Sequence, residues 1–370
     1  MKVNDQAWRS IWREGAILHV VDQTVLPHRF VSRTLHNVAD VADAIQNMVV
    51  RGAPLIGVTG AYGVALAARH DASDATLNAA AATLIATRPT AINLRWAVEQ
   101  TLAQLLALDV SLRASAAFAL ADALAEADVD TNAAIGRHGA ALLRQRWENL
   151  GRPARLNVLT HCNAGWLGCV DWGTALAALY QAHDSGVPVH VWIDETRPRN
   201  QGASLTTWEL AAHGVPATLI VDNAGGLLMQ QGQVDACIVG ADRITARGDV
   251  CNKVGTYLKA LAAQAHQVPF YVAAPVSTID WQAWDGPREI EIEVRAASEV
   301  THITGRTTEG RVVQVQLAPP GTAAHNPAFD VTPATLVSAI VTEQGAVAAT
   351  AAGLQPLRPA HQATAAASAI

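Results

Sequence analysis

The chain has 370 residues, half of them hydrophobic, and its 26 Lys and Arg against 32 Asp and Glu give a formal net charge of -6. Without a basic excess or a long basic run, the composition argues against nucleic acid or an anionic membrane surface as a partner. The longest apolar stretches are interrupted by Arg, His or Asp, so no membrane span is expected, and the first 14 residues lack the apolar core of a signal peptide. A chain of this length is expected to form two domains.

The cysteines and histidines show no metal-binding pattern. Cys162, Cys169, Cys237 and Cys251 have no CxxC spacing, and no two histidines have the spacing of metal ligands. Zinc is therefore not expected. No GxGxxG and no phosphate-loop lysine motif follows any expected strand, and we expect no cofactor. These features indicate a reduced, cytoplasmic protein.

The N-terminal part begins with a pattern of short strands. Three apolar segments punctuated by polar residues predict a small antiparallel meander, at 17–21, 24–26 and 30–35. Asn37 then precedes a stretch with apolar side chains at helical spacing, so we expect a capped helix over 38–49. Pro54 suits the first turn of a second helix over 55–68.

The segment 74–150 is helical in pattern throughout. Breaks near 88–90, 109 and 130 predict a bundle of about four helices. Arg51 and Arg88 each stand beside an expected helix start, where free backbone amides can bind an anion. From the local pattern alone, Arg51 is equally well explained as a helix C-terminal cation, and Arg88 is better explained as a surface charge. We expect the N-terminal domain to cover residues 1–150.

After residue 150, strands alternate with helices. Five apolar strands are expected, at 156–160, 189–194, 217–221, 236–239 and 270–274. The helices between and after them are expected near 174–183, 205–212, 225–230 and 254–266. This alternation predicts a Rossmann-like, doubly wound parallel sheet, which we assign to 151–345. The fold class is thus α/β, with an N-terminal meander and helical bundle followed by a Rossmann-like domain.

Polar residues follow the expected strands at the point where each strand ends. Cys162 follows the first strand, Gln201 the second and Asp242 the fourth, while Asn252 and Lys253 precede the last helix. Because ligands bind at the carboxyl ends of parallel strands, we expect these residues to share one crevice. A thiol there faces helix amides that favour its anion, although a lone cysteine is more often a small buried hydrophobe. Lys253 is expected at a helix start, where it would hold a phosphate.

Five segments, in this order along the chain, carry a resemblance to a known family. They are Arg51-Gly52-Ala53-Pro54-Leu55-Ile56-Gly57, Arg88-Pro89-Thr90-Ala91-Ile92-Asn93-Leu94, Thr160-His161-Cys162-Asn163, Glu195-Thr196-Arg197-Pro198 with Gln201-Gly202-Ala203, and Gly240-Ala241-Asp242-Arg243 through Asn252-Lys253-Val254-Gly255. The chain resembles the methylthioribose-1-phosphate isomerases. That family belongs to a larger group with the alpha, beta and delta subunits of translation initiation factor 2B and the ribose-1,5-bisphosphate isomerases.

The resemblance implies an activity and a set of site residues. The implied reaction is the aldose-to-ketose isomerisation of 5-methylthioribose 1-phosphate to 5-methylthioribulose 1-phosphate in methionine salvage, in a homodimer and without a cofactor or metal. Asp242 would be the proton donor, and Cys162 would assist the transition state or proton transfer. The residues implied to bind the sugar phosphate are Arg51, Gly52, Ala53, Arg88, Gln201, Asn252 and Lys253. An acid must protonate the ring oxygen, which suits Asp242 only if burial holds its pKa above the usual value of about 3.9.

Several alternatives stay open at this point. The substrate could instead be ribose 1,5-bisphosphate or 5-deoxyribose 1-phosphate, or the protein could be a non-catalytic regulator of the initiation-factor type. Trp166, in the turn after Cys162, is expected to form an apolar wall near the 5-substituent, which would disfavour a second phosphate. Hydrogen could move from C2 to C1 as a proton through a Cys162 thiolate or as a direct hydride shift.

The last part of the chain has a weaker pattern. Extended segments are expected at 290–294, 302–305 and 312–317, followed by a final helix over 333–342. The Ala-rich segment 346–370 has no clear apolar face and is expected to be a flexible tail.

Overall fold

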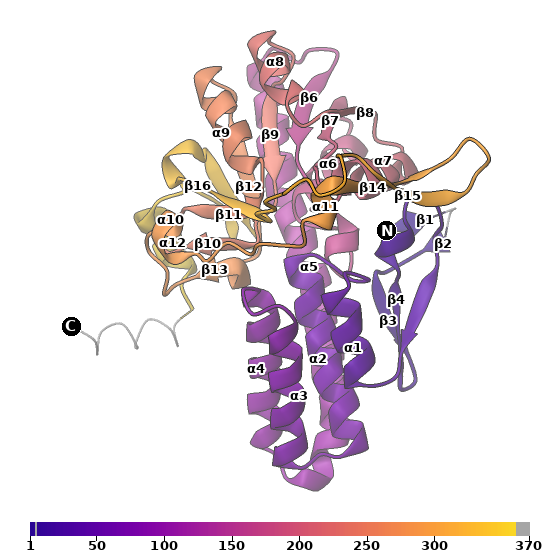
Figure 1. The fold of residues 1–370 in the computed structure, drawn as a ribbon. Helices are drawn as coiled ribbons and strands as arrows, with labels where there is room; N and C mark the ends of the chain where they lie inside the picture. The colour runs from indigo at the N-terminus through magenta and orange to yellow at the C-terminus, as the bar shows by residue number, and fades with distance from the viewer. Residues whose placement is uncertain (4–5, 360–370) are drawn as a thin grey trace.

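The computed structural model describes residues 1–3 and 6–359, and its N-terminal part combines short strands with a helical bundle (Figure 1). The strands are β1 (Lys2–Val3), β2 (Gln6–Ala7), β3 (Ile11–Glu14), β4 (Ile17–Val21) and β5 (Ser32–Leu35). The last three form an antiparallel sheet in the order β3–β4–β5. The helices are α1 (Val38–Gln46), α2 (Ala53–His70), α3 (Asp74–Thr87), α4 (Ile92–Leu106) and α5 (Val110–Asn149). The strand predicted at 24–26 is wrong, because Asp22 caps a short 3-10 helix, Gln23–Val25, by accepting the Thr24 N–H at 2.9 Å.

Helix α5 is 40 residues long and replaces the two helices that were expected on either side of residue 130. Its first half buries Ala117 and Ala121 in the core of the bundle, and its second half buries Ile135 and Leu143 against the large sheet. The apolar pattern shifts near the exposed Asp130 because the buried face changes its partner there, while the helix continues. The predicted break at 130 is therefore wrong. The hydrophobic core changes within α5, ahead of the boundary at 150 that we proposed from the sequence.

The second part of the chain is built on a seven-stranded sheet in the order β18–β17–β12–β9–β6–β7–β8. Its strands are β6 (Leu156–Thr160), β7 (Val189–Asp194), β8 (Ala217–Ile220), β9 (Ala236–Val239), β12 (Phe270–Ala273), β17 (Ala339–Thr342) and β18 (Gly345–Val347). All neighbours are parallel except β17 and β18. The helices are α6 (Ala175–Asp184), α7 (Thr207–His213), α8 (Ala224–Gln230) and α9 (Thr256–Ala265). Val158 and Leu159 are neighbours on β6 and point to opposite faces of the sheet. Val158 packs in a hydrophobic cluster with α5 and α6, and Leu159 packs in another with α8 and α9. The sheet is thus covered on both faces, which confirms the doubly wound fold.

A smaller sheet, which the sequence pattern did not predict, lies beside the carboxyl end of β9. Its order is β13–β10–β11–β16, and its strands are β10 (Arg243–Thr245), β11 (Val250–Lys253), β13 (Ile279–Asp280) and β16 (Phe329–Thr332). Lys253 therefore ends a strand and does not begin a helix, since α9 starts at Thr256. The register pairs Lys253 with Phe329, so this position depends on a segment far along the chain.

The C-terminal part corrects two predictions. The helix expected over 333–342 is wrong. Only Ala334–Leu336 forms a short 3-10 helix, and the β-branched Ile340 and Val341 are buried in strand β17. The prediction of a flexible tail from residue 346 is also corrected. This segment forms β18, α12 (Ala351–Leu354) and a 3-10 helix (Gln355–Leu357), and its Leu354 and Leu357 are buried in the core. Residues 360–370 of that expected tail lie outside the described residues.

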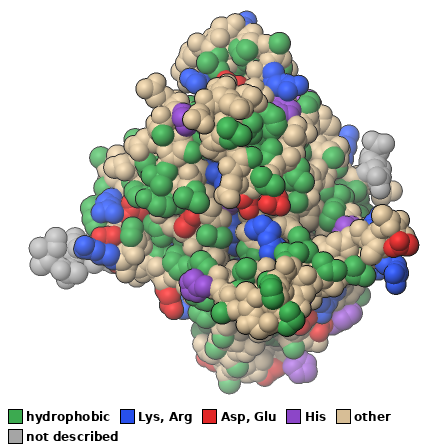
Figure 2. Space-filling model, turned by 45° about the horizontal axis from the view of Figure 1, so that its top comes forward, with side chains coloured by type: hydrophobic (Ala, Val, Ile, Leu, Met, Phe, Trp, Pro, Cys, Tyr) green, Lys and Arg blue, Asp and Glu red, His purple; other side chains and the backbone are tan. Residues whose placement is uncertain are grey.

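A β-hairpin precedes this region. It is formed by β14 (His302–Arg306) and β15 (Val312–Gln316), which confirms the extended segments expected at 302–305 and 312–317. Two short helices, α10 (Gly286–Glu289) and α11 (Ser298–Thr301), come before it, and the segment expected at 290–294 forms only an isolated bridge at Val294. Within the described residues no helix is long and apolar enough to span a bilayer. Figure 2 shows basic and acidic side chains intermingled on one face of the molecule.

Candidate active site

A small cavity of about 60 Å³ lies where the ends of β6, β9 and β11 meet the start of α2. It brings together almost all of the residues predicted from the sequence. Those that line it are Arg51, Gly52, Arg88, Cys162, Gln201, Asp242, Asn252 and Lys253. Ala53 is the exception, because it is the first residue of α2 but does not line the cavity. Two distant parts of the chain thus meet at one place, the α2 region and the carboxyl ends of the parallel strands.

Cys162 is held in a fixed orientation at the end of β6. Its backbone has a φ of +65°, an uncommon conformation for a residue with a side chain. Its N–H donates to Thr196 Oγ1 at 2.8 Å, and its carbonyl accepts from Thr206 Oγ1 at 2.7 Å. The thiol is 8% exposed and donates to Gln201 Oε1 at 3.1 Å. Rotating the Gln201 amide by 180° would present its NH2 group to a thiolate, so this partner suits both protonation states.

Asp242 lies between β9 and β10, and its backbone N–H donates to Cys251 O at 2.9 Å. The side chain is partly exposed, and it lines the cavity. Burial raises the pKa of Asp242 above its ordinary value, while the nearby cations Lys253, Arg88 and Arg51 oppose that rise. The net upward direction is the one that a proton donor near neutral pH requires.

Lys253 and its surroundings make one end of the cavity cationic. The Lys253 ammonium donates to Ala328 O at 2.8 Å and lies 4.9 Å from the centre of the Phe329 ring. Burial, with the neighbouring Arg295 cation, lowers the pKa of Lys253 to about 8. Such a lysine gains its full charge most readily when an anion binds beside it.

Arg295 is a cavity residue to which the sequence analysis gave no role. Its guanidinium carbon lies 5.5 Å from the Phe329 ring centre, and it forms an ion pair of 2.8 Å with Glu293. Glu293 also pairs with Arg88 at 3.0 Å, so one carboxylate orients two cavity cations. The alternation of charges in Glu293-Val294-Arg295 on an extended segment places both charged side chains on one side. That charge pattern was the sequence signal that could have identified Arg295, since no regular element marks the segment.

Arg51 is held by the turn that follows Cys162. Its guanidinium donates to the side chain and the carbonyl of Asn163. A Cβ on Gly52, whose φ is +98°, would lie 2.4 Å from the Gly168 Cα, so only glycine permits this close approach of α2 to the turn. Arg51 is therefore fixed relative to Cys162 by direct contacts.

The same turn is anchored by a buried carboxylate, Glu209. It accepts hydrogen bonds from the Asn163 amide at 3.0 Å, the Tyr180 hydroxyl at 2.8 Å, and the backbone N–H groups of Trp166 and Leu167 at 3.0 and 3.1 Å. Burial raises the pKa of Glu209, while these hydrogen bonds lower it. The turn is thus rigid on the side away from the cavity, which keeps Asn163 in place to hold Arg51.

Trp166 does not have the predicted role. Its side chain is 1% exposed and packs in a cluster with Val3, Val21, Leu26 and Leu205. It does not line the cavity at Cys162. The apolar wall that we predicted at Trp166 is therefore wrong.

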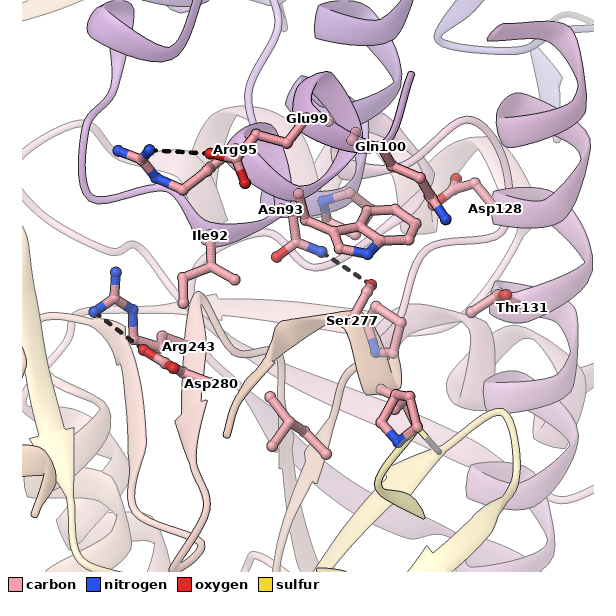
Figure 3. Close-up of a pocket in the computed structure, with 18 of the residues that line it drawn as sticks. Ile92, Asn93, Arg95, Glu99, Gln100, Asp128, Thr131, Arg243, Ser277 and Asp280 are labelled. Carbon is pink, nitrogen blue, oxygen red and sulfur yellow. Dashed lines mark hydrogen bonds and ion pairs between the residues drawn. The ribbon is translucent and has the colours of Figure 1, made fainter. Parts of the chain in front are cut away.

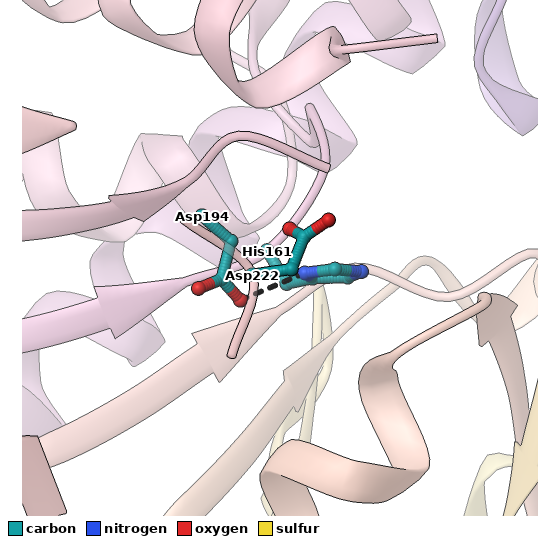
Figure 4. Close-up of side chains that lie close together, drawn as sticks. All are labelled: His161, Asp194 and Asp222. Atoms are coloured by element: carbon teal, nitrogen blue, oxygen red, sulfur yellow. Dashed lines mark hydrogen bonds and ion pairs between the residues drawn. The ribbon is translucent and has the colours of Figure 1, made fainter. Parts of the chain in front are cut away.

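A nearby cluster has the composition of a metal site but not its chemistry. His161, Asp194 and Asp222 have potential ligand atoms within 4.8 Å of one another (Figure 4). However, His161 Nδ1 lies 2.8 Å from Asp194 Oδ2, and His161 Nε2 donates to Val254 O at 2.9 Å. The Lys259 ammonium is 3.3 Å from the same Asp194 oxygen, and the Asp222 carboxylate accepts two backbone amides. The ligand atoms are engaged and a cation is already present, so the cluster does not fit a metal ion.

A larger cavity lies elsewhere, between α4, α5 and the small sheet (Figure 3). It has a volume of about 940 Å³ and contains none of the predicted site residues. Polar contacts along its wall include the Asn93 amide donating to Ser277 Oγ at 3.2 Å, the Arg243–Asp280 pair at 3.6 Å and the Arg95–Glu99 pair at 3.2 Å. Volume alone therefore does not locate the site, whereas the convergence of functional groups does.

Comparison with known proteins agrees with this fold. Residues 49–349 match the model of the Initiation factor 2 subunit family, and the chain belongs to that family. Its curated relatives include the methylthioribose-1-phosphate isomerase of Methylorubrum populi, 59% identical over 97% of this chain and 98% of the relative. The protein of the same name from Gluconobacter oxydans is 56% identical over 97% of this chain and 98% of the relative.

Two solved structures extend the comparison. The 5-methylthioribose 1-phosphate isomerase from Pyrococcus horikoshii OT3 superposes with a TM-score of 0.82 at 37% identity, covering 95% of this chain and 96% of that one. A structure described as the translation initiation factor eIF-2B, subunit delta, from A. fulgidus has a TM-score of 0.76 at 41% identity, covering 92% and 96%. The fold is thus common to proteins described as enzymes and as initiation factors.

Proposed function

We propose that this protein isomerises 5-methylthioribose 1-phosphate to 5-methylthioribulose 1-phosphate, a step of methionine salvage. The observation that carries the proposal is the placement of a thiol, Cys162, and a carboxyl group with a raised pKa, Asp242, on the wall of one cation-lined cavity. Relatives that are 54–59% identical over nearly their full length bear the name of this enzyme, which supports the proposal.

The geometry supports a sequence of two chemical events. Asp242 protonates the ring oxygen, the bond from that oxygen to C1 breaks, and C4 keeps the oxygen as a hydroxyl. In the proton route, the Cys162 thiolate then takes the proton from C2, a C1=C2 double bond forms, and C1 receives a proton as the C2 hydroxyl loses one to give the ketone. In the hydride route, hydrogen moves from C2 to C1 with its electron pair, the C2 hydroxyl returns a proton to the Asp242 carboxylate to leave the ketone, and Cys162 shapes the site.

The remaining residues hold the substrate. Arg51, Arg88 and Lys253 bind the phosphate, with the amides of Gly52 and Ala53 at the start of α2. Gln201 and Asn252 are amides on the cavity wall and are suited to the sugar hydroxyls. Our proposal includes a cytoplasmic homodimer with an N-terminal domain at 1–150 and a catalytic domain at 151–345.

A regulatory function is the second candidate, because a structure described as an initiation-factor subunit is 41% identical to this chain. The deciding experiment follows 5-methylthioribose 1-phosphate by proton NMR with purified protein and without added nucleotide or metal. Formation of the ketose supports the isomerase. If a well-folded protein leaves 5-methylthioribose 1-phosphate, 5-deoxyribose 1-phosphate and ribose 1,5-bisphosphate unchanged, the enzymatic proposal is wrong and the regulatory candidate stands.

The pKa of Lys253 predicts a pH dependence. The ammonium is charged below its pKa of about 8 and loses its charge as the pH rises above that value. Because kcat/KM reports the free enzyme, it is expected to fall above pH 8 by up to about tenfold per pH unit. Initial rates from pH 6 to 10 would measure this decline. In Lys253→Arg the guanidinium stays charged over that range, so the part of the decline that belongs to Lys253 should disappear, while the part that belongs to the acid Asp242 remains. A profile identical to that of the parent would show that Lys253 does not cause the decline near pH 8.

A further inference from the structure

A second, larger cavity adjoins the catalytic cavity. This antechamber, as we call it, has a volume of about 580 Å³ and shares Met48, Arg51 and Gln201 with the catalytic cavity. Its walls come from three segments, 23–29, 198–205 and the β14–β15 hairpin with α11. Arg306 on the hairpin donates to His28 O at 3.0 Å, which ties two of these walls together.

The two volumes indicate where a substrate must extend. A cavity of about 60 Å³ has room for only a few water molecules. A ribose ring with a phosphate and a 5-substituent is several times larger. Even after side chains adjust around the ring and phosphate, the far end of the molecule needs additional space, and the antechamber is the adjoining space.

The different polarity of the two cavities sets which end of the substrate lies in each. The cations that surround Asp242, namely Lys253, Arg88 and Arg295, suit the phosphate on C1. In a furanose, C1 and C4 lie on opposite sides of the ring oxygen, so the group on C5 points away from that phosphate. The antechamber is lined by polar and apolar side chains, and the apolar ones suit an apolar group on C5. They are Val25, Leu26, Pro27, Met48, Pro198, Leu205, Ile303 and Val312.

Met48 stands at the junction of the two cavities in a constrained position. Its backbone φ is +58°, directly after α1, and its N–H donates to Ile45 O at 3.3 Å. Its sulfur lies 3.7 Å from Arg295 Nη1, which orients the thioether beside the cation-lined end. An unbranched, polarisable thioether is well suited to contact another thioether.

The charges in the antechamber are less suited to a second phosphate. Arg199 is neutralised by Glu299 at 2.7 Å. Arg51, on the shared wall, is one of the cations that we assign to the phosphate on C1. Arg29 is exposed, and His28 and His302 are partly exposed, so water competes for any anion there.

We propose that the antechamber is the subsite for the 5-substituent of the substrate, that it accepts 5-alkylthio chains longer than methyl, and that Met48 determines this specificity. The inference rests on the proposed isomerase function. It follows that ethylthio and butylthio substrates should bind more tightly than the methylthio substrate, since each added methylene leaves water for an apolar wall. An affinity gain of about twofold to fourfold per methylene is expected.

The test uses the full-length protein and a series of 5-methylthio-, 5-ethylthio- and 5-butylthioribose 1-phosphates. Turnover gives kcat and KM for the parent protein, and calorimetry on Asp242→Asn gives the dissociation constant without conversion. Met48→Gln places an amide at the junction with a similar length, and Met48→Leu is the matched apolar control. Both keep a side chain at the same backbone position. Ribose 1,5-bisphosphate is measured beside the series.

We expect affinity to rise along the series at an unchanged kcat, with Met48→Gln flattening the trend and Met48→Leu preserving it. The subsite proposal would be overturned if affinity stayed level or fell with chain length. It would also be overturned if ribose 1,5-bisphosphate bound more tightly than the methylthio sugar. Because binding is measured separately, rising affinity without any turnover would reject the isomerase function and leave the subsite in place. Normal turnover of the methylthio substrate with falling affinity along the series would support the isomerase function and reject the subsite.

Discussion

Replacing Asp242 with Asn is expected to lower kcat by about 100-fold to 10,000-fold, the usual contribution of general acid catalysis. The amide keeps the shape of the side chain but has no proton acidic enough to give to the ring oxygen. Asp242 lies on the cavity wall, and burial raises its pKa, so loss of this acid removes the group best placed to open the ring. Initial rates with saturating 5-methylthioribose 1-phosphate would measure the change.

The matched control is Asp280→Asn. Asp280 is a partly buried carboxylate on β13, in the same small sheet, and it pairs with Arg243 at 3.6 Å without lining the catalytic cavity. Its loss should change kcat by much less than the loss of Asp242. If the two variants had similar activity while both were folded, Asp242 would not be the acid.

Replacing Cys162 with Ser should also lower kcat by about 100-fold to 10,000-fold, because a hydroxyl is a far weaker acid than a thiol and is not ionised near neutral pH. The serine can keep the contact with Gln201, which the cysteine makes at 3.1 Å. Turnover in D2O, followed by proton NMR, distinguishes the two routes. Deuterium at C1 of the ketose identifies proton transfer through solvent-exchangeable groups, and its absence shows that the hydrogen of C2 is retained, as the hydride shift requires.

Cys237→Ser is the control for the loss of a buried thiol. Cys237 lies on β9, inside the large sheet and away from the catalytic cavity. This variant should lose thermal stability, because a hydroxyl replaces a thiol in an apolar core, and keep its kcat. A Cys162→Ser protein with parental turnover would remove Cys162 from the mechanism.

The sheet and its crevice could be predicted because their signals are local. Continuous apolar segments mark the parallel strands, and residues such as Cys162 and Asp242 follow those segments directly. The rule that ligands bind at the carboxyl ends of parallel strands then places them together without any knowledge of loop conformation. Arg51 and Arg88, from the helical part, could be added only through the resemblance to a family.

The features that were missed depend on contacts between distant segments. Strand β11, Val250–Lys253, mixes apolar and polar residues, and its pairing with β16 is invisible in a local pattern. Arg295 lies on a segment without a regular element, and its place in the site depends on packing against Phe329, which is distant in the sequence. Trp166 was misassigned because its partners Val3 and Val21 come from the start of the chain.

Helix α5 has a consequence for the way the molecule unfolds. At 40 residues it is about 60 Å long, and its two halves carry side chains of two different hydrophobic cores. Unfolding of either core removes the packing that keeps half of α5 helical. The disrupted helix then destabilises the other core. The two parts therefore form one cooperative unit. A stiff helix, and not a flexible linker, thereby joins the part of the chain that carries Arg51 and Arg88 to the part that carries Cys162 and Asp242.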